Sequence, residues 1–246
     1  MAAMIILFTD FGLEGPYTGQ VKAVLAREAP GVPVIDLMAD VPMQRPREAA
    51  YLLAAYVPAF PADAVFLCVV DPGVGTARPA EALCLDGRWF VGPGNGLFEP
   101  LLRRAGHIKA YTIPPAASLS ASFHGRDLFA PVAGKLARGL DAAATGLAPA
   151  APHRESGWPD ELAAIVYVDR YGNAMTGLRG QAVDARATIE IGGRRYGPAW
   201  TFGSVPAGDA FWYVNSNGLV EIAVNRGRAD ALPGVSVGAP VAIVVD

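Results

Sequence analysis

An unbroken apolar run, Ala64 to Val70, ends at Asp71-Pro72-Gly73 and constrains the fold of this chain more than any other feature. A short run without a polar residue predicts a strand that is buried on both faces, and such strands belong to parallel sheets covered by helices. Asp71 would then lie at the carboxyl end of the strand, the edge at which open α/β sheets bind their ligands. The run therefore predicts an α/β sheet with a candidate functional carboxylate at its edge.

Strand and helix signals alternate through the first part of the chain. A helix is expected after Pro46, because proline suits the first helical turn, and Asp86-Gly87 predicts the turn of a hairpin. This alternation predicts an N-terminal α/β domain over residues 1–140 with a mainly parallel sheet covered on both faces. The expected strands are residues 4–8, 34–38, 64–70, 82–85, 89–91 and 108–113, and the expected helices are residues 19–29, 47–57, 96–105 and 127–138.

The pattern changes after residue 140. Residues 141–159 are small, contain several prolines and lack periodicity, so they are expected to form a linker. Beyond them, short β-rich segments are separated by turns, and Gly192-Gly193 and Asn217-Gly218 are hairpin signals. Residues 160–246 are therefore expected to form a smaller antiparallel barrel or sandwich. Its expected strands are residues 162–168, 187–191, 211–214, 219–224 and 241–245.

The composition argues against several classes of function. The net charge is −3 and only 17% of the residues are charged, whereas a nucleic-acid binder shows a basic face. No apolar run approaches the ~20 residues of a membrane helix, and no N-terminal signal peptide is visible. The sequence thus predicts a soluble cytoplasmic globular protein, with neither a nucleic acid nor a membrane as its partner.

Four side chains could carry chemistry. Asp71 and Arg78 are separated by a glycine-containing loop that could fold the guanidinium back onto the carboxylate, and the ordinary reading of such a pair is a loop-stabilising ion pair. His124 precedes a predicted helix, and a lone histidine is more often structural than catalytic. Together, however, an acid, a guanidinium and an imidazole could orient and deprotonate a water. Asp10 ends the first strand, where it could form a turn or accept hydrogen bonds from two vicinal hydroxyls.

Five motifs follow one another in the order found in one known family, and the similarity covers residues 10–229. The motifs are Phe8-Thr9-Asp10-Phe11-Gly12, Val70 to Arg78, Ser122 to Asp127, Asp169-Arg170-Tyr171-Gly172-Asn173 and Asn215 to Asn225. With them the chain resembles the S-adenosyl-L-methionine (SAM) hydroxide adenosyltransferases, relatives of the SAM-dependent fluorinase and chlorinase. This resemblance implies an α/β domain followed by an antiparallel β-barrel, and hydrolysis of SAM to adenosine and L-methionine by attack of water on C5′ of the ribose. SAM would be the substrate, with no cofactor and no metal.

The resemblance also implies a role for each matching residue. Asp71, Arg78 and His124 would activate the water, and Asp10 would hold the ribose hydroxyls. Asn173 would read the adenine edge, while Asp169 and Ser216 would meet the ammonium and carboxylate of the methionine part. Asn217 stands where the halogenating relatives have an arginine, so recognition of that carboxylate departs from their pattern. The ligand-contacting positions expected beyond residue 160 are Asp169, Asn173, Ser216, Glu221 and Val224.

Three alternatives stay open at this point. The first is a halogenase that uses chloride at the same carbon, although the halogenating relatives have a tyrosine in place of Asp71 and a small or hydroxylic residue in place of His124. The second is a non-catalytic sensor of adenosine or SAM, and the third is a metal phosphohydrolase built on Asp10, Asp71 and His124. The sequence leaves open whether Asp71 or His124 takes the proton. Because relatives form trimers whose sites are shared between subunits, the resemblance further implies a homotrimer with sites at its interfaces.

Overall fold

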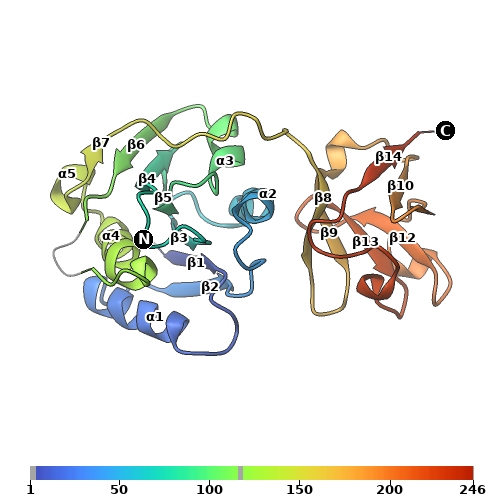
Figure 1. Cartoon of the computed structure of the whole chain (residues 1–246), viewed down its shortest axis with the longest axis horizontal. Helices are drawn as coiled ribbons and strands as arrows, with labels where there is room; N and C mark the ends of the chain where they lie inside the picture. The colour runs from blue at the N-terminus through green and yellow to red at the C-terminus, as the bar shows by residue number, and fades with distance from the viewer. Residues whose placement is uncertain (1–3, 116–118, 246) are drawn as a thin grey trace. The chain divides into compact units, whose positions relative to one another are not determined.

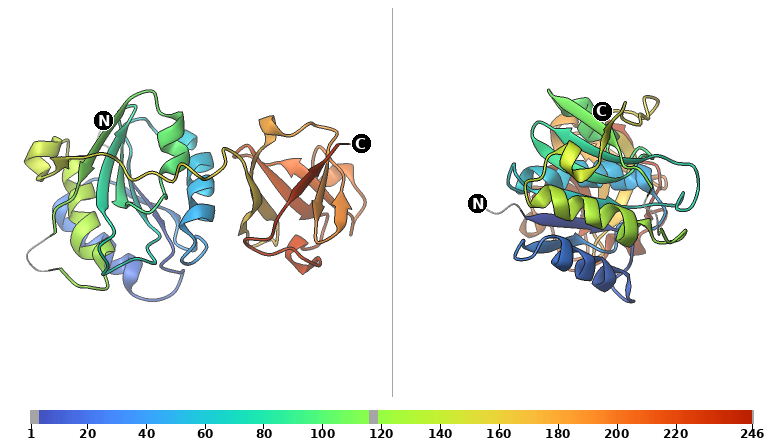
Figure 2. Two further views of the ribbon diagram at one scale, coloured as in Figure 1. Left: turned by 45° about the horizontal axis from the view of Figure 1, so that its top comes forward. Right: turned by 90° about the vertical axis from the view of Figure 1, so that its left-hand side faces the viewer.

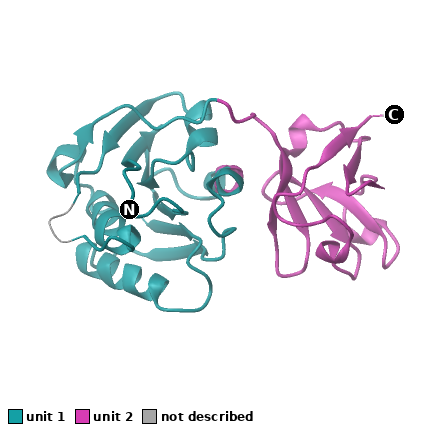
Figure 3. Ribbon diagram, in the orientation of Figure 1, with its two compact units in different colours: residues 1–50, 57–156 teal, residues 51–56, 157–246 magenta. Residues whose placement is uncertain are grey.

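The computed structural model describes residues 4–115 and 119–245. It divides into two compact units, one formed by residues 1–50 with 57–156 and the other by residues 51–56 with 157–246 (Figure 3). The large sheet and most helical residues belong to the first unit, whereas the second consists mainly of short strands (Figure 1).

The described part of the first unit contains a seven-stranded sheet in the order β2-β1-β3-β5-β4-β6-β7. Strand β1 pairs in parallel with β2 and β3, and β3 pairs in parallel with β5. The predicted parallel sheet is confirmed for these strands, and the apolar run before Asp71 is its β3. From β5 outward the pairing is antiparallel, because the Asp86-Gly87 turn reverses the chain between β4 and β5. The strands are β1 Ile5–Thr9, β2 Val34–Met38, β3 Val65–Val69, β4 Ala80–Leu85, β5 Arg88–Pro93, β6 Ile108–Thr112 and β7 Ala148–Pro149.

The central strands β1 and β3 of this sheet are buried on both faces, whereas the outer strands β2, β6 and β7 are partly exposed. Helices α1 and α4 cover one face, where Ile5, Leu7 and Val65 share a core with Val21 and Leu25 of α1 (Figures 1 and 2). The opposite face carries an aromatic row that runs from Phe66 and Phe90 to Phe98 at the start of α3. The helices are α1 Tyr17–Glu28, α2 Pro46–Tyr56, α3 Glu99–Arg104, α4 Ala130–Ala137 and α5 Ala142–Thr145, with a π-helix at Gly125–Phe129 and 3₁₀ turns at Val57–Ala59, Gly180–Ala182, Phe202–Ser204 and Ala229–Ala231.

Two neighbours hold the carboxyl end of β3 in place. A Cβ atom on Gly92 would lie 2.2 Å from the carbonyl oxygen of Cys68, so only glycine allows β5 to approach β3 this closely. The Asn95 side-chain amide donates to the carbonyl oxygen of Val70 at 2.9 Å. The backbone immediately before Asp71 is therefore fixed from the adjoining strand.

The linker predicted over residues 141–159 is shorter than expected. Asp141 caps α5 by accepting from the backbone N–H of Ala144, and β7 then pairs with β6. Two buried carboxylates hold the segment that follows, because Glu81 accepts from the His153 N–H at 3.1 Å and Glu99 accepts from Arg154 at 3.0 Å. The first unit consequently extends to Ser156. Composition did not reveal this docking, since the carboxylates that receive the segment are more than fifty residues away in the sequence.

The second unit forms the predicted antiparallel barrel. Its described residues build a four-stranded sheet, β12-β13-β9-β8, and a three-stranded sheet, β11-β10-β14. Bridges between Ala164 and Pro240 and between Pro198 and Trp212 join the edges of the two sheets and close the ring. The strands are β8 Leu162–Val168, β9 Ala174–Arg179, β10 Thr188–Ile191, β11 Arg194–Tyr196, β12 Ala210–Val214, β13 Leu219–Val224 and β14 Ala242–Val244.

Both predicted hairpin turns are present in the barrel. Gly192 and Gly193, with φ of 57° and 76°, connect β10 to β11, and Gly218, with φ of 80°, lies between β12 and β13. Strands β9 and β11 were not predicted, because β9 contains a glycine and β11 has only three residues. No helix in residues 4–115 and 119–245 has the length and apolar character needed to cross a membrane.

Candidate functional site

The loop between β3 and β4 returns the chain so that Arg78 meets Asp71. The Val74 N–H donates to the Asp71 carbonyl at 3.3 Å, and the Thr76 hydroxyl donates to the Gly73 carbonyl at 2.7 Å. Gly75 has φ of 79°, and a Cβ atom there would lie 2.7 Å from the carbonyl oxygen of Ala121. This position therefore requires glycine, and the loop has a single defined shape.

Arg78 joins the acid and the imidazole. Its Nε donates to Oδ1 of Asp71 at 2.7 Å, and its Nη2 donates to Oδ2 of the same carboxylate and contacts Nδ1 of His124 at 3.0 Å. The remaining nitrogen, Nη1, donates to the Pro79 carbonyl at 3.0 Å. The Asp71 and Arg78 side chains are 5% and 10% exposed, so this bidentate pair is largely removed from water. The structure thus brings together the three residues predicted to activate water.

The contact with Arg78 determines the proton arrangement on His124. A guanidinium has only donors, so the Nδ1 atom of His124 must accept the hydrogen bond from Nη2. The neutral imidazole then carries its proton on Nε2. Burial, and next the positive charge of Arg78, lower the pKa of His124. At neutral pH the ring is therefore uncharged, with Nε2–H as its available donor.

A π-helix positions His124. His124 immediately precedes Gly125–Phe129, a π-helical turn of a kind that is frequent at functional sites. A Cβ atom on Gly125 would lie 2.9 Å from the Phe11 ring, so this turn packs directly against the segment that follows β1. Asp127, one turn further on, accepts from the Ser120 N–H and pairs with Arg126. The turn that follows His124 is therefore held by packing at Gly125 and by the hydrogen bonds of Asp127.

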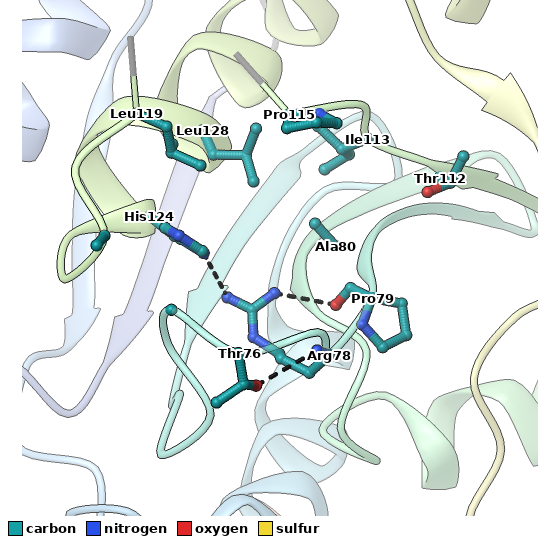
Figure 4. A pocket seen from close by; sticks show the side chains of 12 residues that line it. Thr76, Arg78, Pro79, Ala80, Thr112, Ile113, Pro115, Leu119, His124 and Leu128 are labelled. Carbon is teal, nitrogen blue, oxygen red and sulfur yellow. Dashed lines mark hydrogen bonds between the residues drawn. The ribbon is translucent and has the colours of Figure 1, made fainter. Parts of the chain in front are cut away.

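A cavity of about 500 Å³ adjoins Arg78 and His124. Figure 4 shows the two side chains facing each other at its border, with Ile113, Leu119 and Leu128 lining the other side. Besides Arg78 and His124, the polar side chains that line this cavity are those of Thr76 and Thr112, which carry hydroxyl groups. The cavity therefore offers a space with both polar and apolar walls beside the neutral imidazole.

The Asp10 carboxylate lies near that of Asp71. Oδ2 of Asp10 accepts from the Gln44 backbone N–H at 2.9 Å. Burial raises the pKa of Asp10, the hydrogen bond from Gln44 partly opposes this, and the nearby Asp71 charge adds a smaller increase. Gln44 has a left-handed backbone with φ of 57°, which is uncommon for a residue other than glycine. The loop that follows β2 thus bends so that its backbone can hold the Asp10 carboxylate.

The predicted residues of the second unit line a separate cavity of about 610 Å³. Both Asp169 oxygens accept from Asn173, one from its backbone N–H at 2.8 Å and one from its side-chain amide at 3.1 Å. The side-chain amide oxygen Oδ1 of Asn173 has no partner among the described residues and therefore remains available to a ligand. All five predicted positions, Asp169, Asn173, Ser216, Glu221 and Val224, line this cavity.

Glu221 is engaged by its own barrel. It is 2% exposed and accepts from the Tyr213 hydroxyl at 2.6 Å and from the Asn215 amide at 2.8 Å. Burial raises its pKa, an effect that these hydrogen bonds partly oppose. The Glu221 side chain therefore supports the wall of the cavity, which leaves backbone groups of β13 as the means by which this position could contact a ligand.

The sequence analysis missed several residues of this cavity. Phe202, Tyr213 and Tyr171 line it, and Tyr171 is 77% exposed. Arg226 lines it as well. Tyr171 could have been found from its place inside the Asp169–Asn173 motif, but Phe202 lies in a 3₁₀ turn without a sequence signature. Aromatic rings of this kind provide stacking surfaces for a planar ligand.

The nine predicted residues fall into two groups, one in each unit. Asp10, Asp71, Arg78 and His124 lie in the first unit, and the remaining five lie in the second. Within the described ranges, no group of three or more His, Cys, Asp or Glu side chains is placed to hold a metal ion.

Comparison with known proteins identifies the family. Residues 5–146 match the family model of the SAM hydroxide adenosyltransferase N-terminal domain, and residues 163–242 match that of the C-terminal domain. A protein of Thermus thermophilus named (R)-S-adenosyl-L-methionine hydrolase is 44% identical, and the match covers 98% of this chain and 99% of that protein. A fluorinase from Actinoplanes sp. is more distant, at 23% identity over 56% of this chain and 55% of its own.

A solved structure is similar to this chain over nearly its whole length. The crystal structure of an uncharacterized conserved protein from Thermotoga maritima superposes with a TM-score of 0.88 at 31% identity, covering 98% of this chain and 100% of that chain. The similarity thus extends across both units, and the resemblance seen in the five motifs is confirmed. The chain belongs to the SAM hydroxide adenosyltransferase family.

Proposed function

We propose that this protein hydrolyses SAM to adenosine and L-methionine by attack of water on C5′ of the ribose. The observation that carries the proposal is the hydrogen-bonded set of Asp71, Arg78 and His124 at the carboxyl end of β3. The relatives named (R)-S-adenosyl-L-methionine hydrolase support the choice of substrate. The reaction forms the C5′–O bond and breaks the C5′–S bond, and the electron pair stays on sulfur, so methionine leaves as a neutral thioether.

The hydrogen bonds favour Asp71 as the proton acceptor. His124 already accepts at Nδ1, so its Nε2–H can donate to the attacking oxygen but cannot remove a proton from it. The Asp71 carboxylate accepts twice from Arg78 and keeps further lone pairs for a water. A weak base suffices, because the oxygen of the water becomes positively charged and strongly acidic as it bonds to C5′. Arg78 would then act by fixing the positions of the Asp71 carboxylate and the His124 imidazole relative to each other.

Alignment of the reactants would supply much of the rate. The sulfonium is already a good leaving group, so the protein mainly has to hold the water in line with the C5′–S bond. Orientation of this kind contributes up to ~7–11 kcal/mol, and a positioned base adds about 10²–10⁴-fold. Asp10 would fix the ribose by accepting from its two hydroxyls, and the Gln44 N–H would fix Asp10 in turn.

The cavity of the second unit would bind the nucleoside and the amino acid. The free side-chain oxygen Oδ1 of Asn173 can accept from the adenine amino group, and Phe202 offers a ring for stacking. Asp169 would attract the substrate ammonium, and the exposed Ser216 would donate to the carboxylate. Backbone groups of Glu221 and Val224 would complete the purine contacts.

We further propose that the enzyme is a cytoplasmic homotrimer that needs no cofactor and has no nucleic-acid or membrane partner. Its proposed substrate is an intracellular metabolite, and the slightly negative charge suits a small-molecule enzyme. The water-activating residues and the nucleoside cavity belong to different units, so a complete site requires both. A cyclic trimer repeats one heterologous interface three times, which would let each site combine the first unit of one chain with the second unit of its neighbour.

Product analysis in ¹⁸O-labelled water tests the reaction. The purified protein is incubated with each sulfonium epimer of SAM, in chloride and in a halide-free buffer, with and without a chelator. We expect labelled adenosine carrying ¹⁸O at the 5′ position, in equal yield with or without chloride and chelator. Formation of 5′-chloro-5′-deoxyadenosine as the main product would identify a halogenase instead. Unchanged SAM would identify a sensor, and loss of turnover in chelator would identify a metal enzyme.

A further inference from the structure

Arg226 adopts a backbone conformation that its side chain disfavours. It follows β13 in a turn closed by the Gly227 N–H, which donates to the Val224 carbonyl at 3.1 Å. As the third residue of this turn, Arg226 has φ of 57°, a position that favours glycine or asparagine. An arginine at a left-handed position indicates that its side chain has a use that offsets the strain.

The Arg226 side chain lacks any structural role within the described residues. It is exposed, and it makes no hydrogen bond or ion pair with any residue in the ranges 4–115 and 119–245. Arg228, two residues further on, pairs with Asp230 instead. Arg226 nevertheless lines the cavity that contains Asn173 and Phe202. An unpaired guanidinium in a ligand cavity is available to a ligand.

We propose that Arg226 stacks its guanidinium on the purine base of the substrate and so contributes to specificity for the nucleoside. The inference rests on the proposed function, because it requires a purine in this cavity. Arginine is planar and stacks on flat π systems, and the cavity already provides the aromatic rings of Phe202, Tyr171 and Tyr213. The base would thus be held between a side chain of the barrel and the turn after β13.

Electrostatics favours stacking over charge attraction. SAM carries a sulfonium, an ammonium and one carboxylate, so its net charge is +1 and a second cation gains nothing from long-range attraction. The purine is the neutral, flat part of the molecule, and a guanidinium can approach its face. Loss of such a stacking contact should weaken affinity about tenfold, which corresponds to about 1.4 kcal/mol. Because the base does not react, the contact should affect ground state and transition state equally.

Three substitutions separate the roles that Arg226 could have. We expect Arg226→Gln and Arg226→Lys to raise KM for SAM and Kd for adenosine by about tenfold each, with kcat unchanged, since lysine keeps the charge but lacks the plane. Arg226→Gly should weaken binding to the same extent while Tm stays the same or rises by about 2–4 °C, because glycine relieves the backbone strain. Arg170→Gln is the matched control, since Arg170 is exposed, lacks a side-chain partner among the described residues and does not line the cavity.

KM and kcat are measured by steady-state kinetics, Kd by calorimetric titration with adenosine, and Tm by thermal unfolding. If Arg226→Lys keeps the wild-type KM for SAM and Kd for adenosine, then the positive charge of Arg226 and not stacking accounts for binding, and the inference is overturned. A lower Tm in Arg226→Gly would show that Arg226 supports the fold. Wild-type KM and Kd in all three variants would refute the inference while leaving the proposed function intact. The proposed function itself fails if the wild-type protein does not convert SAM to adenosine, which is measured first, whereas the stacking contact is tested separately by the Kd for adenosine.

Discussion

Removal of Asp71, Arg78 or both should separate the structural role of this pair from its catalytic role. Each side chain is at most 10% exposed, and Arg78 is the only side chain bonded to the Asp71 carboxylate among the described residues. Asp71→Ala leaves the guanidinium with the Pro79 carbonyl and His124, and Arg78→Met leaves the carboxylate without a partner. Breaking a buried pair costs about 3–5 kcal/mol, and we expect the lower end because the pair touches solvent.

The double variant provides the decisive comparison. Asp71→Ala/Arg78→Met removes both charges and keeps an apolar side chain against the Phe129 ring, which lies 5.2 Å from the Arg78 guanidinium carbon. Replacement of a buried ion pair by apolar groups is often neutral, so its stability should be within ~1 kcal/mol of the wild type. Each single variant should lose ~3 kcal/mol, which lowers Tm by about 6–12 °C in a chain of this length. Turnover should fall at least about 10²-fold in all three variants.

Urea denaturation followed by circular dichroism, together with adenosine release from SAM, measures both effects. Glu190→Gln is the control, because its ion pair with Arg195 is 35% and 56% exposed and should contribute less than ~1 kcal/mol. If the double variant loses the sum of the two single losses, the side chains are not coupled and the structural reasoning fails. If the double variant recovers both stability and turnover, the pair has no role in catalysis.

Three further outcomes can be checked directly. Burial raises the pKa of Glu81 from its ordinary 4.5 to about 7, so folded protein binds the proton more tightly and stability is lost as pH rises from about 4.5 to 7. Glu81→Gln should therefore raise the urea midpoint at pH 8 relative to wild type and change it little at pH 5. If the urea midpoints of the variant and the wild type depend on pH in the same way, this prediction is contradicted. Asn173→Ala should raise KM for SAM about tenfold or more with a smaller change in kcat, whereas an unchanged KM would remove Asn173 from the binding site. At SAM concentrations well below the wild-type KM, where Asp71→Ala and Asn173→Ala are each strongly impaired, equal mixing and random exchange of the two kinds of subunit should restore ~1/2 × 1/2, or about a quarter, of wild-type activity if sites are shared in a ring. No recovery after exchange proven by mass spectrometry would place each site within one chain.

Local sequence determined the type of most elements and the order of the two units. The apolar run before Asp71 could only be a strand buried on both faces, and in the structure β3 pairs with β1 and β5 while all of its side chains are buried. Turn chemistry determined the hairpins, because Asp86-Gly87 and Gly192-Gly193 supply the left-handed residues that such turns need. These features depend on neighbours in the chain, so they can be read without the fold.

Tertiary structure decided how the chemical groups are arranged. Arg78 and His124 are 46 residues apart, and only the packing of the π-helix against the β3–β4 loop brings Nη2 to Nδ1 and so sets the proton on Nε2. The docking of residues 150–156 on Glu81 and Glu99 could not be predicted from the sequence either. Composition does not reveal that a buried carboxylate accepts a hydrogen bond from a backbone N–H far away in the chain. The strained turn at Arg226 faces a cavity only because the barrel closes around it. The sequence specifies which groups are present, and long-range packing decides their distances and protonation, because these depend on neighbours that are remote along the chain.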